Sequence, residues 1–148
     1  MRIAFISDIH SNLQALTQAL SIIDERGASQ VYCLGDIVGY GGNPNECVDL
    51  VRERASLCVL GNHDMAALDP ATAEFFSKPG RIAVEWTHTV LTPDNARFLA
   101  SLPYSAATDI CTLVHASPLD PRQWQYVLSL QVARPQFQAF STQLCFIG

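Results

Sequence analysis

The strongest constraint on the fold is a series of short apolar runs separated by segments with helical periodicity. Four such runs, each of four or five residues, occupy residues 3–6, 31–34, 57–60 and 110–114. Nearly continuous apolar runs of this length are typical of strands that are covered on both faces. We therefore expect a sheet that is buried between two layers.

The two segments between the first three runs have the features of amphipathic helices. In the first segment, apolar residues recur every three or four positions, at Leu13, Leu16, Leu20 and Ile23. In the second, Asn43 is a candidate helix cap, Pro44 would take the first helical position, and Glu46 follows three residues after the cap. The resulting βαβαβ order predicts an α/β fold with parallel strands and helices on both faces of the sheet.

The remaining sequence extends this fold to a single domain over residues 1–148. Residues 64–109 are predicted to be mainly helical, with one helix starting at Thr92 and ending at Pro103. Residues 116–136 are predicted to form a long loop with one short helix, and a further strand begins at Cys145. Because the sequence ends just after this strand starts, we expect a truncated domain whose sheet is incomplete at the C-terminus.

Composition excludes several classes of protein. The chain has 148 residues and 49% apolar composition, enough for one core, and its net charge of −5 argues against a bulk nucleic-acid surface. No apolar run approaches the roughly 20 residues of a membrane span. The five cysteines form no C-x-x-C pair and are interpreted as reduced thiols of a cytoplasmic protein. An exposed apolar sheet edge would allow a homo-oligomer.

Polar residues follow the predicted strands at four places. They are Asp8 and His10 after the first strand, Asp36 after the second, Asn62 and His63 after the third, and His115 after the fourth. Because the carboxyl ends of parallel strands meet in one crevice, we expect these side chains to gather there. Each motif alone is also compatible with a turn, a helix cap or a packed histidine. Together they predict a site for a divalent metal such as Mn, Fe, Ni or Zn.

Four short motifs resemble four of the five motifs of the calcineurin-like metallophosphoesterases. They are Asp8-Ile9-His10, Gly35-Asp36-Ile37-Val38, Gly61-Asn62-His63-Asp64 and His115-Ala116-Ser117-Pro118. The resemblance covers residues 1–118 and implies an α/β sandwich that hydrolyses phosphodiesters or small nucleotides by attack of a metal-bridging hydroxide. The protein phosphatases of this family have Asp and Arg where this chain has Gly39 and Tyr40. This difference favours the small prokaryotic phosphodiesterase-like branch.

The resemblance also implies a role for each site residue. Asp8 and His10 would bind the first of two metal ions, and Asp36 would bridge both ions. Asn62 and His115 would bind the second ion. His63 would lie over the scissile phosphate of a small phosphorylated substrate and act as a general acid or as a charge stabiliser. Manganese is the metal we expect most, with Fe, Ni or Zn as alternatives.

The fifth motif of the family, G-H-x-H, is the main departure. The sequence reaches Gly148 where the glycine of that motif would stand, so two further imidazoles are not in this sequence. Their loss would weaken metal binding. The alternative function is therefore a catalytically impaired domain that serves as a binding or interaction module.

Three further interpretations stay open from the sequence. Asp64 either starts a helix or orients a neighbouring group. Trp124, Tyr126 and Arg122 either line the substrate rim or pack the loop that follows His115. Tyr40, beside the second motif, either contacts substrate or serves only the local chain geometry.

Overall fold

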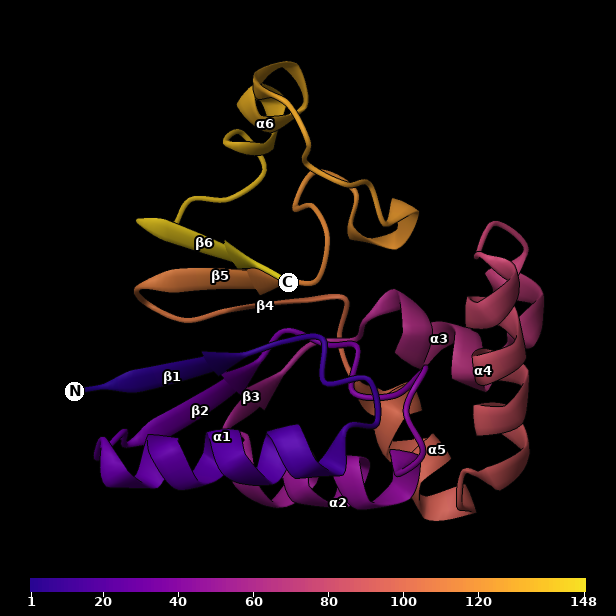
Figure 1. Cartoon of the computed structure of the whole chain (residues 1–148). Helices are drawn as coiled ribbons and strands as arrows, with labels where there is room; N and C mark the ends of the chain where they lie inside the picture. The colour runs from indigo at the N-terminus through magenta and orange to yellow at the C-terminus, as the bar shows by residue number, and fades with distance from the viewer.

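Two three-stranded sheets form the centre of the computed structural model, which describes all 148 residues (Figure 1). The first sheet is entirely parallel and has the order β1 (Ile3–Ile6), β2 (Gln30–Cys33) and β3 (Leu57–Cys58). In the second sheet β5 (Cys111–Val114) lies between β4 (Ser105–Ala107) and β6 (Leu144–Ile147). Strand β5 pairs antiparallel with β4 and parallel with β6.

Helices cover only the outer face of the first sheet. Figure 1 shows α1 (Leu13–Glu25) and α2 (Pro44–Arg54) running beneath β1, β2 and β3. Beyond β3, three helices pack at one end of the molecule: α3 (Asn62–Leu68), α4 (Lys78–Val90) and α5 (Pro93–Ser101). In the sequence, the last helix, α6 (Leu130–Gln136), comes after β5 and a 3₁₀ turn at Pro121–Gln123 and before β6. None of these helices is both long and apolar enough to span a bilayer.

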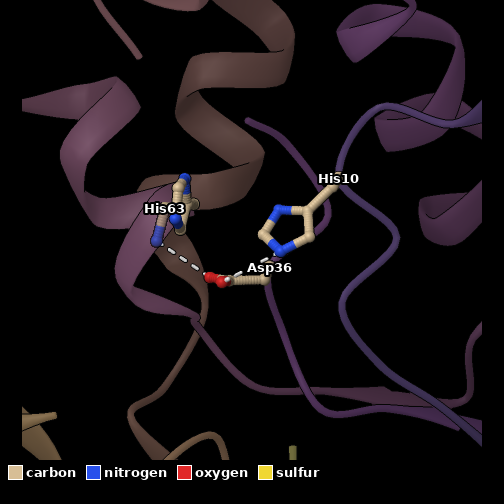
Figure 2. A group of neighbouring side chains, drawn as sticks. All are labelled: His10, Asp36 and His63. Atoms are coloured by element: carbon tan, nitrogen blue, oxygen red, sulfur yellow. Dashed lines mark hydrogen bonds and ion pairs between the residues drawn. The ribbon is translucent and has the colours of Figure 1, made fainter. Parts of the chain in front are cut away.

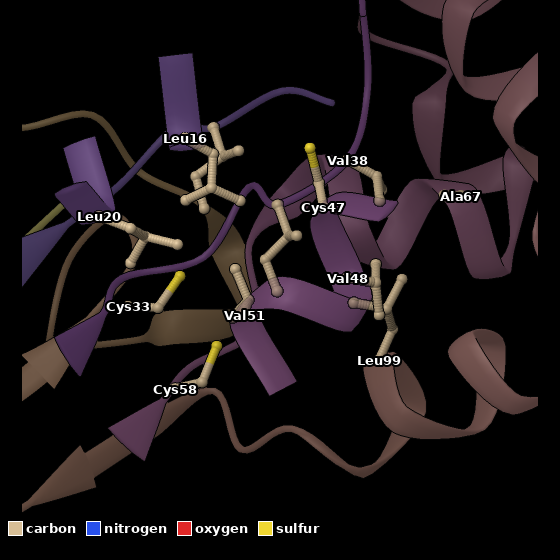
Figure 3. Close-up of a cluster of buried hydrophobic side chains, with 12 residues drawn as sticks. Leu16, Leu20, Cys33, Val38, Cys47, Val48, Val51, Cys58, Ala67 and Leu99 are labelled. Atoms are coloured by element: carbon tan, nitrogen blue, oxygen red, sulfur yellow. The ribbon is translucent and has the colours of Figure 1, made fainter. Parts of the chain in front are cut away.

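The larger core lies between the first sheet and the helices. Side chains alternate along the strands, so Ile6, Cys33 and Cys58 all face this layer. They pack against leucines of α1 and valines of α2, as Figure 3 shows for Leu16, Leu20, Val48 and Val51. This packing confirms the amphipathic pattern from which α1 was predicted, and the cysteines behave there as small apolar residues.

A second core lies between the two sheets. Here the alternate side chains of the first sheet, among them Phe5, Tyr32 and Leu57, meet Leu113 of β5 and Phe146 of β6. The rings of Phe5 and Phe146 stack with their centroids 3.9 Å apart. This inter-sheet core explains why the strands of the first sheet are apolar at nearly every position.

The observed architecture corrects the expectation in three ways. The prediction that helices cover both faces of the first sheet was wrong, because the second sheet covers one of these faces. Residues 105–107, predicted within a mainly helical segment, form β4. The third strand ends at Cys58 and not at Leu60 as predicted, and the backbone N–H of Leu60 donates to the carbonyl oxygen of Pro103. An apolar run shows that both faces are covered but does not show which element covers them.

The inter-sheet core makes a prediction about stability. Leu113 is fully buried between the sheets, so Leu113→Ala should lower the free energy of unfolding by about 2–5 kcal/mol. Leu130→Ala, at a position 73% exposed, should change it by less than about 0.5 kcal/mol. Urea denaturation followed by circular dichroism measures both. Equal effects of the two substitutions would show that the sheets do not pack as described.

Candidate metal centre

One cavity of about 280 Å³ lies at the ends of strands from both sheets. Its lining includes all six residues that the sequence singled out for metal binding or catalysis: Asp8, His10, Asp36, Asn62, His63 and His115. Five of them follow strands of the first sheet, whereas His115 follows β5 of the second. The convergence therefore depends on how the two sheets stack, and not on a single parallel sheet as the sequence argument assumed.

Three of these residues have unusual backbone conformations. Asp8, His10 and Asp36 have φ angles of 52°, 49° and 52°, in the left-handed region that non-glycine residues seldom occupy. Backbone hydrogen bonds hold the strained segments together: the Asp8 N–H donates to Gly35 O at 3.1 Å, and the His10 N–H donates to Asp36 O at 2.9 Å. Strain of this kind is typical of residues held in position for ligands.

Asp36 lies at the centre of the group and is 2% exposed. Its Oδ1 accepts a hydrogen bond from the backbone N–H of His63 at 2.8 Å. Its Oδ2 lies 3.8 Å from Nε2 of His10 and 3.4 Å from Nε2 of His115, and Figure 2 shows His10 and His63 on either side of it. Burial alone would raise the pKa of Asp36, but the hydrogen bond and charge of His115 outweigh burial and lower it.

The two imidazoles that face Asp36 are oriented in the same way. Nδ1 of His10 lies 3.1 Å from the carbonyl oxygen of Val38, and Nδ1 of His115 lies 2.7 Å from that of Leu34. A carbonyl oxygen can only accept, so each Nδ1 carries the proton and donates it. Nε2 of each ring then faces Asp36, where a protonated ring can donate to the carboxylate and a neutral ring can bind a cation through its lone pair. This is the arrangement by which proteins orient metal-binding histidines.

The donor atoms fit a divalent cation. Two sets of three residues, His10 with Asp36 and His63, and Asp8 with Asp36 and His115, each bring their ligand atoms within 4.8 Å of one another. Oδ1 of Asn62 lies 3.0 Å from Nε2 of His115 and adds a neutral oxygen. Lone pairs that face one another in this way need a proton or a cation between them. How the residues divide between two ions stays a prediction.

The ring of His63 packs against two aromatic rings. Its ring centroid lies 4.7 Å from that of Tyr40 and 4.5 Å from that of Phe76. Gly39 has φ +96°, and a Cβ placed there would lie 2.5 Å from Nδ1 of His63, so no side chain fits. Nδ1 itself is buried without a hydrogen-bond partner. Burial lowers the pKa of His63.

Asp64 connects two of the loops that form the site. It is completely buried, and its carboxylate accepts hydrogen bonds from the backbone N–H groups of Val38 and Gly61, both at 3.0 Å. Burial and the nearby charge of Asp36 raise the pKa of Asp64 to about 7. The expected role at the start of a helix is confirmed, and the bond to Val38 is an orienting contact in addition.

The rest of the cavity wall combines three aromatic residues with the aliphatic side chains of Val127, Leu128 and Ile147. Tyr40, Trp124 and Tyr126 line it, as one interpretation of the sequence proposed. Arg122 does not, because its guanidinium lies over the ring of Tyr104, 4.7 Å from the centroid. Sequence reasoning missed Phe76, since nothing in its neighbourhood marks it as a partner of His63. The end of the chain also lies there, and the backbone N–H of Gly148 donates to the carbonyl oxygen of His115 at 2.7 Å.

The position of Asp64 predicts a large effect on stability. Asp64→Ala would leave two buried N–H groups without partners, at about 1–3 kcal/mol each, so the free energy of unfolding should fall by roughly 2–6 kcal/mol. Asp94→Ala is the matched control, because Asp94 is a 73% exposed aspartate in the first turn of α5. It should cost less than about 1 kcal/mol. Chemical denaturation measures both values, and a small loss in Asp64→Ala would contradict the connecting role.

The environment of His115 predicts a pH dependence for the metal-free protein. Burial would lower the pKa of His115, but its hydrogen bond to Asp36 and the charge of Asp36 raise it from 6.5 to about 9. A raised pKa in the folded state stabilises the fold fully below pH 6.5, and this stabilisation is lost as the pH rises through 9. It amounts to at most about 3 kcal/mol.

Urea denaturation between pH 6 and pH 10 in the presence of a chelator measures this dependence. The His115→Gln variant should have lower stability at pH 6 and a flatter profile than the original chain. Parallel profiles for the two proteins would show that His115 does not carry the effect.

Comparison with known proteins identifies the family to which this geometry belongs. A family model for calcineurin-like phosphoesterases matches residues 1–135. The uncharacterized protein MJ0912 of Methanocaldococcus jannaschii is 47% identical over 129 residues, which make up 84% of this chain and 53% of that protein. A crystal structure of a metallophosphoesterase from Sphaerobacter thermophilus has a TM-score of 0.86 and 42% identity, and the match covers 100% of this chain and 60% of that one.

A third comparison supports the fold alone. The hypothetical protein PH1004 from Pyrococcus horikoshii OT3 has a TM-score of 0.78 at 18% identity, and the match covers 99% of this chain and 68% of that one. The chain thus spans only 53% to 60% of the length of the two more similar relatives. The resemblance seen in the four sequence motifs is confirmed: the chain belongs to the calcineurin-like phosphoesterase family.

Proposed function

We propose that this chain forms the metal-binding part of a phosphoesterase that hydrolyses phosphodiesters or small nucleotides. One observation carries the proposal. The carboxylate of Asp36 lies between Nε2 of His10 and Nε2 of His115, and a backbone carbonyl fixes the orientation of each ring. A buried carboxylate between two oriented imidazoles is suited to holding a divalent cation, and membership of the family supports a pair of such ions.

The residues of this chain divide the work of binding. A bound pair of divalent ions supplies Lewis-acid activation of water and neutralises phosphate charge. Asp8, His10 and Asp36 would hold one side of the pair, and Asp36, Asn62 and His115 the other. The amide of Asn62 offers an oxygen without adding a negative charge, which suits a site for an anionic substrate. Mixed oxygen and imidazole ligands favour Mn²⁺, with Fe, Ni or Zn as alternatives.

His63 is the proposed proton donor to the leaving oxygen. Burial lowers its pKa, which favours the uncharged ring in the ligand-free protein. A phosphate anion beside the ring would raise the pKa again, because a nearby negative charge favours the protonated form. Proton donation then coincides with substrate binding, and such a step contributes about 10²–10⁴-fold to the rate.

The cellular compartment follows from the thiols. All five cysteines are free, and four of them are buried. Unpaired thiols are typical of proteins that work in a reducing compartment. We therefore place this protein in the cytoplasm.

Hydrolysis of bis-p-nitrophenyl phosphate with and without Mn²⁺ tests the proposal. Turnover should require the metal and should fall about 100-fold or more in His63→Ala. His88→Ala is the matched control, because Nδ1 of His88 also lies near a backbone carbonyl, that of Ala67 at 2.8 Å, but outside the cavity. The control should keep its full turnover.

Metal binding is measured separately by calorimetry with Mn²⁺. Binding that is lost in Asp36→Asn, together with no turnover in any condition, would favour the alternative function as a metal-binding or interaction module. No binding of Mn²⁺ to the unaltered chain would contradict the proposed metal centre itself.

A further inference from the structure

His63 differs from the other two imidazoles of the cavity in what holds its ring. Nδ1 of His10 and Nδ1 of His115 each donate to a backbone carbonyl oxygen, which fixes the direction of the ring. Nδ1 of His63 is buried and has no hydrogen-bond partner. The Asp36 carboxylate holds only the backbone N–H of His63, so the orientation of this imidazole depends on packing.

Of the two aromatic rings that contact this imidazole, Phe76 has the firmer support. Its ring centroid lies 4.5 Å from that of His63, with an angle of 39° between the ring planes. Tyr40, on the loop after β2, is 53% exposed. Phe76 is instead partly buried against a small apolar cluster formed by α3, α4 and the 3₁₀ turn Pro70–Ala73 between them. Phe76 therefore connects the packing of these helices to the ring of His63.

Backbone contacts fix the segment that carries Phe76. The N–H of Phe76 donates to the carbonyl oxygen of Ala73 at 3.0 Å, and the guanidinium of Arg81 donates to the carbonyl oxygen of Phe76 at 3.2 Å. Gly80, in the first turn of α4, lies close to both rings: a Cβ there would lie 3.5 Å from Cβ of Phe76 and 3.3 Å from the hydroxyl of Tyr40. The start of α4 thus packs directly behind the two rings.

The orientation of this ring matters for the chemistry proposed above. His63 lines the cavity and its Nδ1 is buried, so Nε2 is the nitrogen that can reach a substrate. A half-turn of the imidazole about its Cβ–Cγ bond would replace Nε2 with a carbon atom, which has no proton to donate. Proton transfer also requires a hydrogen-bond distance of about 2.6–3.2 Å between the heavy atoms. A ring that is free to turn would therefore be a poor general acid.

We propose that Phe76 is a positioning residue, which holds the imidazole of His63 with Nε2 directed into the cavity. Phe76 acts through His63, because it is not among the residues that line the cavity. Its ring does by packing what a carbonyl oxygen does for His10 and His115. The inference rests on the proposed function, in which His63 donates a proton to the leaving oxygen.

Nuclear magnetic resonance of the metal-free protein tests the orientation without any turnover. The chain has four histidines, and the ring-proton signals of His63 are assigned by their loss in His63→Ala. In Phe76→Leu these signals should split or broaden, because the ring then exchanges between orientations, whereas those of His88 should stay unchanged. Phe75→Leu is the matched control, because Phe75 is the neighbouring phenylalanine but is 94% exposed. It should leave the signals of His63 as they are.

Two esters with different leaving groups test the role in the reaction. Diphenyl phosphate releases phenolate, which is more basic than the p-nitrophenolate released from bis-p-nitrophenyl phosphate and depends more on a proton donor. With Mn²⁺ present, Phe76→Leu should lower kcat about 100-fold for diphenyl phosphate but only about tenfold for bis-p-nitrophenyl phosphate. Phe76→Tyr keeps the ring and should restore most of the kcat for both esters.

The outcomes distinguish this inference from the proposed function. Loss of kcat by the same factor for both esters, or His63 signals that neither split nor broaden in Phe76→Leu, would overturn the positioning role and leave the phosphoesterase proposal standing. No turnover of either ester by the unaltered chain would contradict the proposed function, and the resonance comparison would still decide whether Phe76 orients His63. If Phe76→Leu does not fold, Phe76→Met replaces it, because a flexible methionine fills the same space without a ring.

Discussion

The buried carboxylate of Asp36 is the feature on which the rest of the site depends. A carboxylate removed from water costs several kcal/mol unless it is hydrogen-bonded and paired. Here the backbone N–H of His63 and two imidazoles provide the compensation. Each of these partners comes from a different loop. The contacts that stabilise the Asp36 carboxylate therefore fix the relative positions of three segments of the chain. The cavity is the space that this arrangement leaves above the carboxylate.

Holding the loops in place also has a cost in backbone conformation. The left-handed residues Asp8, His10 and Asp36 each cost on the order of 1–3 kcal/mol if no neighbour supports them. The hydrogen bonds between adjoining loops, and the two that Asp64 accepts, offset this strain. The strained backbone thus lowers the stability of the fold, but it holds the candidate ligand atoms in positions that need little rearrangement when a ligand binds.

Local patterns predicted much of this molecule, and long-range packing decided the rest. The helices α1 and α2 followed from periodicity and capping, and the six site residues from polar positions after apolar runs. The sequence did not reveal the second sheet, since Val59 and Tyr32 look the same whether a helix or a sheet covers them. The contact of Phe76 with His63 also could not be predicted from the sequence, because a residue in a loop has no periodic pattern that indicates what it packs against. The roles of the individual ligands stay predictions.

The separation of the site across two sheets has a consequence for how the protein is made. Nδ1 of His115 bonds to the carbonyl of Leu34, which lies 81 residues earlier in the chain. Contacts of such long range form late, and a growing chain presents its N-terminal part first. A nascent chain that ended before β5 would carry Asp8, His10, Asp36 and Asn62 but not His115. The candidate ligands of this chain come together only once the second sheet has docked, so we expect metal binding to follow synthesis of β5.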